Sequence, residues 1–307
     1  MPGFDPRVTP ARADLAAASL EGKIAAAKYV EGQVYHVVAA QAPLRQAPRP
    51  DAPLDTEALL GERVTVYERN EEGWAWGQLA LDNYVGWLPQ SALGPPGAPP
   101  THKVVALRSF AFPGPSIKLP PLEALPFGAT LAVAKSEGRM AVTAAGAYVP
   151  LPHLAPIGDN ATDFVAVAER FLGVPYLWGG KTALGLDCSG LVQIALAACG
   201  VGCPRDSDMQ ERALGSAAAR DLSSFQRGDL VFWKGHVAIV RDATNFLHAN
   251  AFHMAVAIEP IAGAVARIQA AGSEVTGVRR IAPQVILAET AGGRGSSWNE
   301  GTAEQGR

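Results

Sequence analysis

The stretch DCSGLVQIALAACG at residues 187–200 predicts how the C-terminal part of this 307-residue chain folds. The residues after Asp187 are mostly apolar and predict a buried helix, which Gly200 ends. Cys188 therefore lies in the first turn of this helix. Unpaired N–H groups and the positive end of the helix dipole favour an anion at that point. We therefore expect a thiol biased towards the nucleophilic thiolate.

Two histidines further along the chain are spaced so that a β-hairpin brings them together. Turn signals separate three predicted strands, at residues 230–233, 236–240 and 246–250. Folding the last two strands about residue 242 or 243 places His236 opposite His248 or diagonal to it, on one face of the sheet. With Cys188 these rings would form a chain of nucleophile, base and orienting residue.

Simpler interpretations of the same residues exist. A cysteine at the start of an apolar helix can be a small buried hydrophobe, and each histidine can be structural. Cys188, His236 and His248 could also bind zinc with Cys199 or Cys203, but no paired C-x-x-C element is present to complete such a site. We expect no metal and no organic cofactor.

Five segments carry a resemblance to a known family: PYLWGG (175–180), LDCSGLVQ (186–193), RGDLVFW (227–233), GHVAIV (235–240) and FLHAN (246–250). In order and spacing they resemble the NlpC-type family of cell-wall cysteine peptidases. The resemblance implies a papain-like α+β domain over residues 158–288 that cleaves between γ-D-glutamate and a diamino acid. It makes Cys188 the nucleophile, His236 the general base and acid, and His248 the orienting residue, with His253 a weaker candidate for that third place.

A finer resemblance concerns substrate binding. The segment CPRDSDMQ (203–210) resembles the cleft segment of family members that carry fused bacterial SH3-like domains. In that subfamily the aspartate before the nucleophile binds the free amine of an N-terminal L-alanine, together with a tyrosine and an acidic residue of the first SH3-like barrel. The acid here is Glu57 or Glu62, and the sequence does not choose between them. The substrate-binding residues that this resemblance implies are Tyr84, Tyr176, Asp187, Ser189 and Ser207. Plain capping or turn roles are the alternatives for Asp187 and Ser207.

An internal repeat precedes the peptidase domain. EALLGERVTVYE (57–68) parallels EALPFGATLAVAK (123–135), and NYVGWLPQSAL (83–93) parallels AYVPLPHLAP (147–156). We predict a multidomain chain with two small β-barrels that resemble bacterial SH3-like domains, at residues 30–97 and, in degenerate form, 101–156. The proline-rich LGPPGAPPT (93–101) links them. We expect a helical arm over residues 1–29, with the helix at 11–30, and disorder in the polar, Gly-rich tail at 289–307.

Composition narrows the classes of function. A formal net charge of −3 and a pI near 6.1 give no basic stripe, so we expect no nucleic-acid partner. With three cysteines, no apolar stretch of signal-peptide length and no membrane span, we expect a cytoplasmic protein that does not bind membranes. The oligomeric state is not predicted. The function expected is an endopeptidase for murein peptides with a free N-terminal L-alanine, in cell-wall recycling. An acyltransferase or amidase on the same scaffold and a non-catalytic wall-fragment binding protein are the alternatives.

Overall fold

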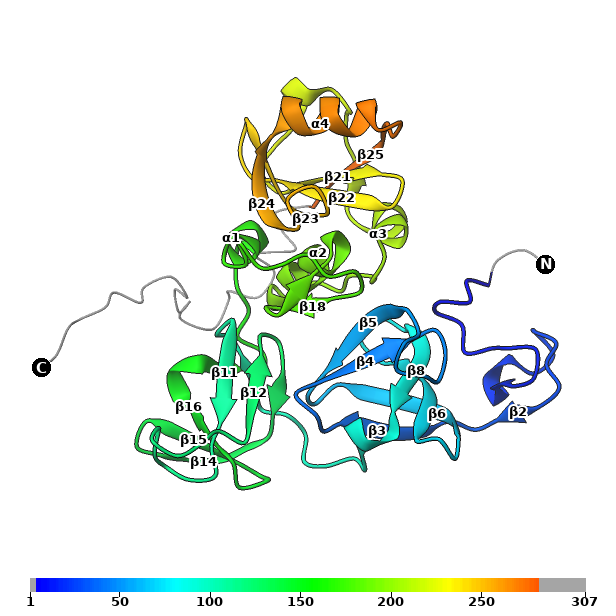
Figure 1. Ribbon diagram of the computed structural model, residues 1–307, viewed down its shortest axis with the longest axis vertical. Helices are drawn as coiled ribbons and strands as arrows, with labels where there is room; N and C mark the ends of the chain where they lie inside the picture. Colours follow the sequence, from blue (N-terminus) through cyan, green and yellow to red (C-terminus); the bar gives the residue numbers. More distant parts are fainter. Residues whose placement is uncertain (1–3, 282–307) are drawn as a thin grey trace, which may run out of the picture.

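Three folded units follow a short N-terminal segment in the computed structural model, which describes residues 4–281 (Figure 1). The units are a first β-domain, a second β-domain and a C-terminal domain of helices and strands. The predicted tail at 289–307 lies outside the described residues. None of the described helices has both the length and the apolar character that a membrane crossing requires.

The first β-domain is one antiparallel sheet with the strand order β5-β4-β8-β7-β6-β3-β9. Alternation along β6 places Val64 and Val66 in its core, as the sequence predicts. A short 3-10 helix, η2 (Gln90–Ala92), leads into the last strand. The strands are β3 (Gln33–Val37), β4 (Gln41–Arg45), β5 (Leu54–Leu59), β6 (Arg63–Arg69), β7 (Trp74–Leu79), β8 (Val85–Pro89) and β9 (Leu93–Gly94).

The second β-domain consists of three small sheets, ordered β13-β10-β17, β11-β12 and β14-β15-β16. Its end repeats the end of the first domain, because a 3-10 helix, η3 (Leu151–His153), again joins the last two strands. The description as a second SH3-like barrel stays a prediction. The strands are β10 (His102–Val104), β11 (Arg108–Ala111), β12 (Glu123–Pro126), β13 (Thr130–Leu131), β14 (Val133–Glu137), β15 (Met140–Thr143), β16 (Tyr148–Pro150) and β17 (Leu154–Pro156).

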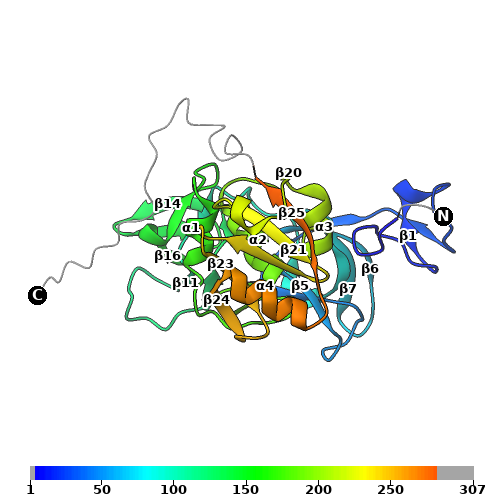
Figure 2. The same cartoon turned by 90° about the horizontal axis from the view of Figure 1, so that it is seen from above.

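The N-terminal segment is not the predicted helix. It contains β1 (Ala16–Ala17), which pairs in parallel with β2 (Tyr29–Val30), and one 3-10 turn, η1 (Ala18–Leu20). Leu15 packs with Trp76 of the first β-domain, and this burial outweighs the helix propensity of the many alanines nearby. The segment lies at one end of the molecule beside the first β-domain (Figure 2).

The C-terminal domain is built on a six-stranded antiparallel sheet with the order β20-β25-β21-β22-β23-β24. A separate pair of short strands precedes its longest helix. The strands are β18 (Lys181–Thr182), β19 (Gly185–Leu186), β20 (Ser216–Ala217), β21 (Asp229–Trp233), β22 (His236–Val240), β23 (Asn245–Asn250), β24 (Ala255–Pro260) and β25 (Val275–Arg280). The helices are α1 (Phe164–Glu169), α2 (Cys188–Ala198), α3 (Ser207–Ala213), the 3-10 helix η4 (Leu222–Ser224) and α4 (Ile261–Ala270).

Helices cover both faces of this sheet. Side chains of β21 to β23 alternate between a core shared with α1 and α2 and a second core shared with α4. The helix at 188–198 and the predicted strands at 230–233, 236–240 and 246–250 are confirmed, and Gly200 has the expected left-handed conformation with φ of 76°. In Figure 1 the start of the domain, at β18 and α2, faces β5 of the first β-domain.

Candidate active site

Cys188 is the first residue of α2, and Asp187 caps the helix. The Asp187 Oδ1 accepts a hydrogen bond of 2.7 Å from the Gly190 N–H. The cysteine is 6% exposed, and this residue lines a cleft between the first β-domain and the C-terminal domain. The nucleophile predicted from the sequence is therefore buried in the protein wall but open to the cleft.

His236 and His248 meet through the predicted hairpin. Ile239 pairs with Leu247 and Val240 with Phe246, a register that makes the two histidines diagonal neighbours on one face. The His236 Nε2 lies 2.9 Å from the His248 Nδ1. The structure thus brings the two rings into hydrogen-bond contact. His253 hydrogen-bonds to Asn250 instead.

A fourth residue, Glu259 on β24, extends this chain and was not predicted. Its Oε2 lies 3.0 Å from the His248 Nε2, and the Arg267 guanidinium holds the carboxylate at 2.7 Å and 3.0 Å. Burial raises the pKa of Glu259, but the Arg267 guanidinium and the His248 ring lower it more, so that the carboxyl is an ionised acceptor. A glutamate in the apolar strand sequence AVAIEP (255–260) was the signal that could have indicated it.

The Glu259 carboxylate sets the proton positions along the chain. Burial lowers the pKa of His248 to about 4, against the raising effect of Glu259. Burial, the nearby His248 and the Arg267 charge lower the pKa of His236 to about 3. Both rings are therefore neutral near pH 7. Since an ionised carboxylate only accepts, the His248 Nε2 carries the proton and its Nδ1 accepts from the His236 Nε2–H. This leaves the His236 Nδ1 unprotonated and free to act as a base.

The thiol of Cys188 does not show the predicted bias towards thiolate. Burial raises its pKa to about 12, and the Asp187 charge adds to this increase. The backbone N–H groups of Val237 and Ser189 lie against the sulfur and lower the pKa, as expected at a helix N-terminus, but by less. In the resting protein the Cys188 thiol and the His236 imidazole are therefore both neutral near pH 7. The helix N-terminus therefore lowers the pKa of Cys188 in the predicted direction, but burial raises this pKa by more.

The cleft next to Cys188 has walls from three parts of the chain. The N-terminal segment, the first β-domain and the C-terminal domain all contribute to it, and Tyr84, Tyr176, Asp187, Ser189 and Ser207 are among the predicted residues that line it. Tyr176 lines the same cleft as Cys188, and burial raises the pKa of its hydroxyl. Further lining residues that the sequence analysis did not single out are Arg7, Arg12, Asp55, Trp76, Trp87, Trp178, Asp206 and Asp208.

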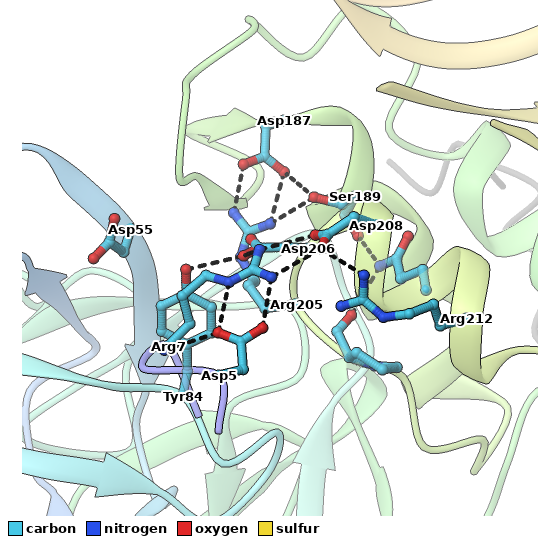
Figure 3. Close-up of polar contacts among 12 residues, drawn as sticks. Asp5, Arg7, Asp55, Tyr84, Asp187, Ser189, Arg205, Asp206, Asp208 and Arg212 are labelled. Atoms are coloured by element: carbon cyan, nitrogen blue, oxygen red, sulfur yellow. Dashed lines mark hydrogen bonds and ion pairs between the residues drawn. The ribbon is translucent and has the colours of Figure 1, made fainter. Parts of the chain in front are cut away.

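Asp187 is already fully paired by other protein groups. Its two oxygens accept from the buried Arg205 guanidinium at 2.9 Å and 2.6 Å (Figure 3). Its Oδ2 also accepts from the Gly179 N–H at 2.8 Å. Ser189 belongs to the same network, since its Oγ accepts from Arg205 and donates to Asp187. This pairing argues against the prediction that Asp187 receives a substrate ammonium, because both of its carboxylate oxygens already accept hydrogen bonds from protein donors.

Two other aspartates also bring negative charge to the cleft. Asp206, one residue before α3, accepts at Oδ2 a hydrogen bond of 3.0 Å from the Tyr84 hydroxyl. Asp55, on β5, lines the same cleft, and its pKa is raised by burial and by the charge of Asp206. The charged run RDSD in the segment 203–210 could have indicated Asp206 as a residue of the cleft. From this segment we predicted Ser207 as a substrate-binding residue instead.

Glu57 and Glu62 hold Lys181 of the C-terminal domain. The Glu57 Oε2 accepts from the Lys181 backbone N–H at 2.8 Å, and the Glu62 Oε1 pairs with the Lys181 Nζ at 3.0 Å. Lys181 is 1% exposed, so this contact is part of a buried junction between domains. The prediction that one of these glutamates meets the substrate amine does not agree with these positions, since both carboxylates are engaged by Lys181. Asp55 on the same strand lines the cleft instead.

Two family matches fall on these domains. Residues 173–271 match the NlpC/P60 family. The C-terminal domain is an NlpC/P60 domain. Residues 44–93 match the bacterial dipeptidyl-peptidase SH3 domain, so that the first β-domain is an SH3 domain of that kind. The NlpC-type resemblance predicted from the sequence is confirmed, including the fused SH3 domain.

Two relatives that carry the same name are similar to this chain over about two thirds of its length. It is 27% identical over 250 residues to the gamma-D-glutamyl-L-lysine dipeptidyl-peptidase of Bacillus cereus, covering 68% of this chain and 71% of the relative. The protein of the same name from Bacillus subtilis is 28% identical over 227 residues, covering 65% and 73%. A crystal structure of an NlpC/P60 family protein from Bacillus cereus superposes with a TM-score of 0.69 at 23% identity, covering 81% of this chain and 99% of that one. This last likeness extends the shared fold over the NlpC/P60 domain and the domains before it.

Proposed function

We propose that this protein is a cysteine peptidase that hydrolyses the bond between γ-D-glutamate and a diamino acid in murein peptides with a free N-terminal L-alanine. The observation that carries the proposal is that the backbone N–H of Val237 lies against the Cys188 sulfur, while the neighbouring His236 starts the hydrogen-bonded chain to His248 and Glu259. The family of the NlpC/P60 domain and the names of the two dipeptidyl-peptidases support a peptidase, and the name also supports the bond. The papain-like description belongs to this proposal.

The reaction starts from the neutral pair of thiol and imidazole. The unprotonated Nδ1 of His236 takes the Cys188 proton as the sulfur attacks the scissile carbonyl, and His248 with Glu259 stabilises the imidazolium that forms. The Cys188 backbone N–H at the start of α2 and the Tyr176 hydroxyl face the developing oxyanion. His236 then gives its proton to the departing amine. A water molecule attacks the thioester, with His236 again as base, and the γ-D-glutamyl product leaves.

Recognition of a free amine is assigned to Asp206, Asp55 and Tyr84. Two carboxylates from different domains face one cleft, and burial raises the pKa of each. An ammonium group between them gains charge-assisted hydrogen bonds, whereas an acylated nitrogen gains no ion pair and leaves both carboxylates desolvated. This explains a preference for peptides already released from the glycan. We propose on that basis that the reaction serves cell-wall recycling in the cytoplasm.

The test compares L-Ala-γ-D-Glu-diaminopimelate and L-Ala-γ-D-Glu-L-Lys with their N-acetylated forms, using mass spectrometry of the products. We expect the free peptides to release L-Ala-D-Glu at least about tenfold faster than the acetylated peptides release N-acetyl-L-Ala-D-Glu, because one ion pair is lost. Cys188→Ala abolishes cleavage of all four. Asp206→Asn lowers the preference for the free peptides, and Asp51→Asn on an exposed turn is the control. Equal cleavage of both forms would contradict amine recognition, and no cleavage by the wild type would contradict the peptidase.

A further inference from the structure

Arg7 lies in the cleft wall with all of its N–H groups engaged by three carboxylates (Figure 3). Its Nε and Nη2 donate to Asp5 at 3.0 Å and 2.7 Å. Its Nη1 donates to the Asp206 Oδ2 at 2.7 Å, and both Nη atoms donate to Asp208 at 2.8 Å. A guanidinium has five N–H groups in a planar fork, so this arrangement uses its whole capacity.

The segment that carries Arg7 is fixed to the SH3 domain. The Arg7 carbonyl accepts from the Val85 N–H at 2.8 Å, and the Val8 carbonyl accepts from the Gln78 side chain at 2.9 Å. Arg12 stacks over the Trp76 ring at 4.4 Å. Arg7 therefore reaches from a backbone bound to one domain to carboxylates of the other, across the cleft that substrate enters.

Arg7 and Tyr84 act on the same atom, the Oδ2 of Asp206. Two donors from different parts of the chain fix the rotation of this carboxylate. The Arg7 charge also opposes burial, which raises the pKa of Asp206, so that it favours the ionised form. Arg7 thus supplies both the orientation and the charge state that an ammonium partner requires.

We propose that the N-terminal segment completes the substrate site and that Arg7 is a specificity-determining positioning residue, which holds Asp206 ready for the terminal ammonium of the peptide. This inference rests on the proposed function and adds a third part of the chain to its site. Arg7 does not touch the scissile bond. Its contribution is to the binding of the free amine and not to the chemical step at Cys188.

The test uses the full chain with Arg7→Met, Arg7→Lys and Arg212→Met. Arg212 also pairs with Asp208, at 3.0 Å, but from the exposed side, so it is a matched control for the loss of one cation on that carboxylate. For each protein, kcat and KM are measured on L-Ala-γ-D-Glu-diaminopimelate and on its N-acetylated form from pH 5 to pH 9. Circular dichroism and thermal unfolding verify that each variant is folded.

We expect Arg7→Met to raise KM for the free peptide about 10- to 100-fold, with kcat within about threefold of the wild type, since a charge-assisted contact is lost in binding alone. The acid limb of kcat/KM moves to higher pH, because Asp206 without Arg7 ionises less readily. Arg7→Lys retains the charge and therefore the acid limb, with a smaller rise in KM. Arg212→Met behaves as the wild type. A merely structural role would not shift the pH limb or be rescued by lysine.

Two outcomes overturn the inference while leaving the proposed function intact. One is a wild-type KM and pH profile in folded Arg7→Met, and the other is a lower KM, which would make Arg7 a competitor of the ammonium. If Arg7→Met does not fold, a wild-type KM together with a displaced acid limb in Arg7→Lys also overturns it. If the wild type itself cleaves free and acetylated peptides equally, the proposed amine recognition fails and this inference fails with it.

Discussion

Replacing Glu259 by glutamine tests whether a carboxylate sets the proton positions of the active site. The Glu259 Oε1 and Oε2 both accept from Arg267, and Oε2 also accepts from the His248 Nε2. Glutamine has a single acceptor oxygen in its side chain, so it cannot accept hydrogen bonds in both carboxylate oxygen positions. When the oxygen turns to the Arg267 Nε, the amide NH₂ faces His248 and reverses its tautomer. The His248 Nδ1 then donates to the His236 Nε2, so the proton of His236 moves to Nδ1, where the base must be free.

The expected loss is in kcat. A hydrogen bond to a charged group contributes about 1.5–3 kcal/mol, which corresponds to a loss of about 10- to 100-fold if it is needed only when the imidazolium forms. The full tautomer reversal raises the loss towards about 10⁴-fold. Steady-state kinetics on the free tripeptide measures the effect, with KM unchanged because Glu259 does not line the cleft.

The control for this prediction is Glu274→Gln, which changes an exposed glutamate that accepts a hydrogen bond from Gln269. Its kcat should equal that of the wild type. Thermal unfolding shows whether Glu259→Gln remains folded. A folded Glu259→Gln protein with kcat within about threefold of the wild type would refute the tautomer argument, because the loss expected from a charged hydrogen bond is larger.

Three further predictions follow from burial. Lys181→Met leaves Glu62 buried without its partner and should lower the free energy of unfolding in urea by about 3 kcal/mol; a loss below about 0.5 kcal/mol, as in an exposed-pair control such as Lys135→Met, would contradict this. The pKa values of His236 and His248 are lowered to about 3 and about 4, so the unfolded chain binds protons first and stability should fall as pH drops from about 6.5 towards 4. Thermal melts at several pH values measure this, and a slope that is the same in the His236→Gln/His248→Gln double variant would contradict it. Because burial raises the pKa of Cys188 to about 12, iodoacetamide should label it slowly at pH 7 and faster as pH rises, relative to a Cys188→Ser background; rapid labelling with a plateau below pH 7 would contradict the neutral resting thiol.

The parts of the site that depend on neighbouring sequence were predictable. Turn signals and strand alternation set the register that joins His236 to His248, and an apolar run with its terminal glycine set the helix that starts at Cys188. Both are local patterns with a fixed period. The prediction of a Cys188 thiolate was wrong. The effect of a helix dipole can be predicted from a local sequence, whereas the extent of burial, which has the larger effect on the pKa, depends on the whole fold.

Contacts between distant segments were not predictable in the same way. The pairing of Arg205 with Asp187 depends on how two segments of the C-terminal domain fold together, and the approach of Arg7 to Asp206 depends on how the N-terminal segment docks against that domain. The structure of the N-terminal segment was not predictable for the same reason. Its alanines favour a helix locally, but the packing of Leu15 on Trp76 of the first β-domain favours another conformation. Even so, the charged residues of the segment 203–210 were visible in the sequence, and buried carboxylates in such a run indicate a site that has partners elsewhere.

Because β25 lies between β20 and β21, the sheet that carries both histidines is complete only after the last described strand has left the ribosome. A growing chain holds its SH3 domain and the thiol long before that, while β21 still presents an open edge. We expect prematurely terminated chains that end before residue 275 to be inert and prone to aggregate or to be degraded. Only chains that include β25 would then be active, and tags that replace β25 should yield no activity.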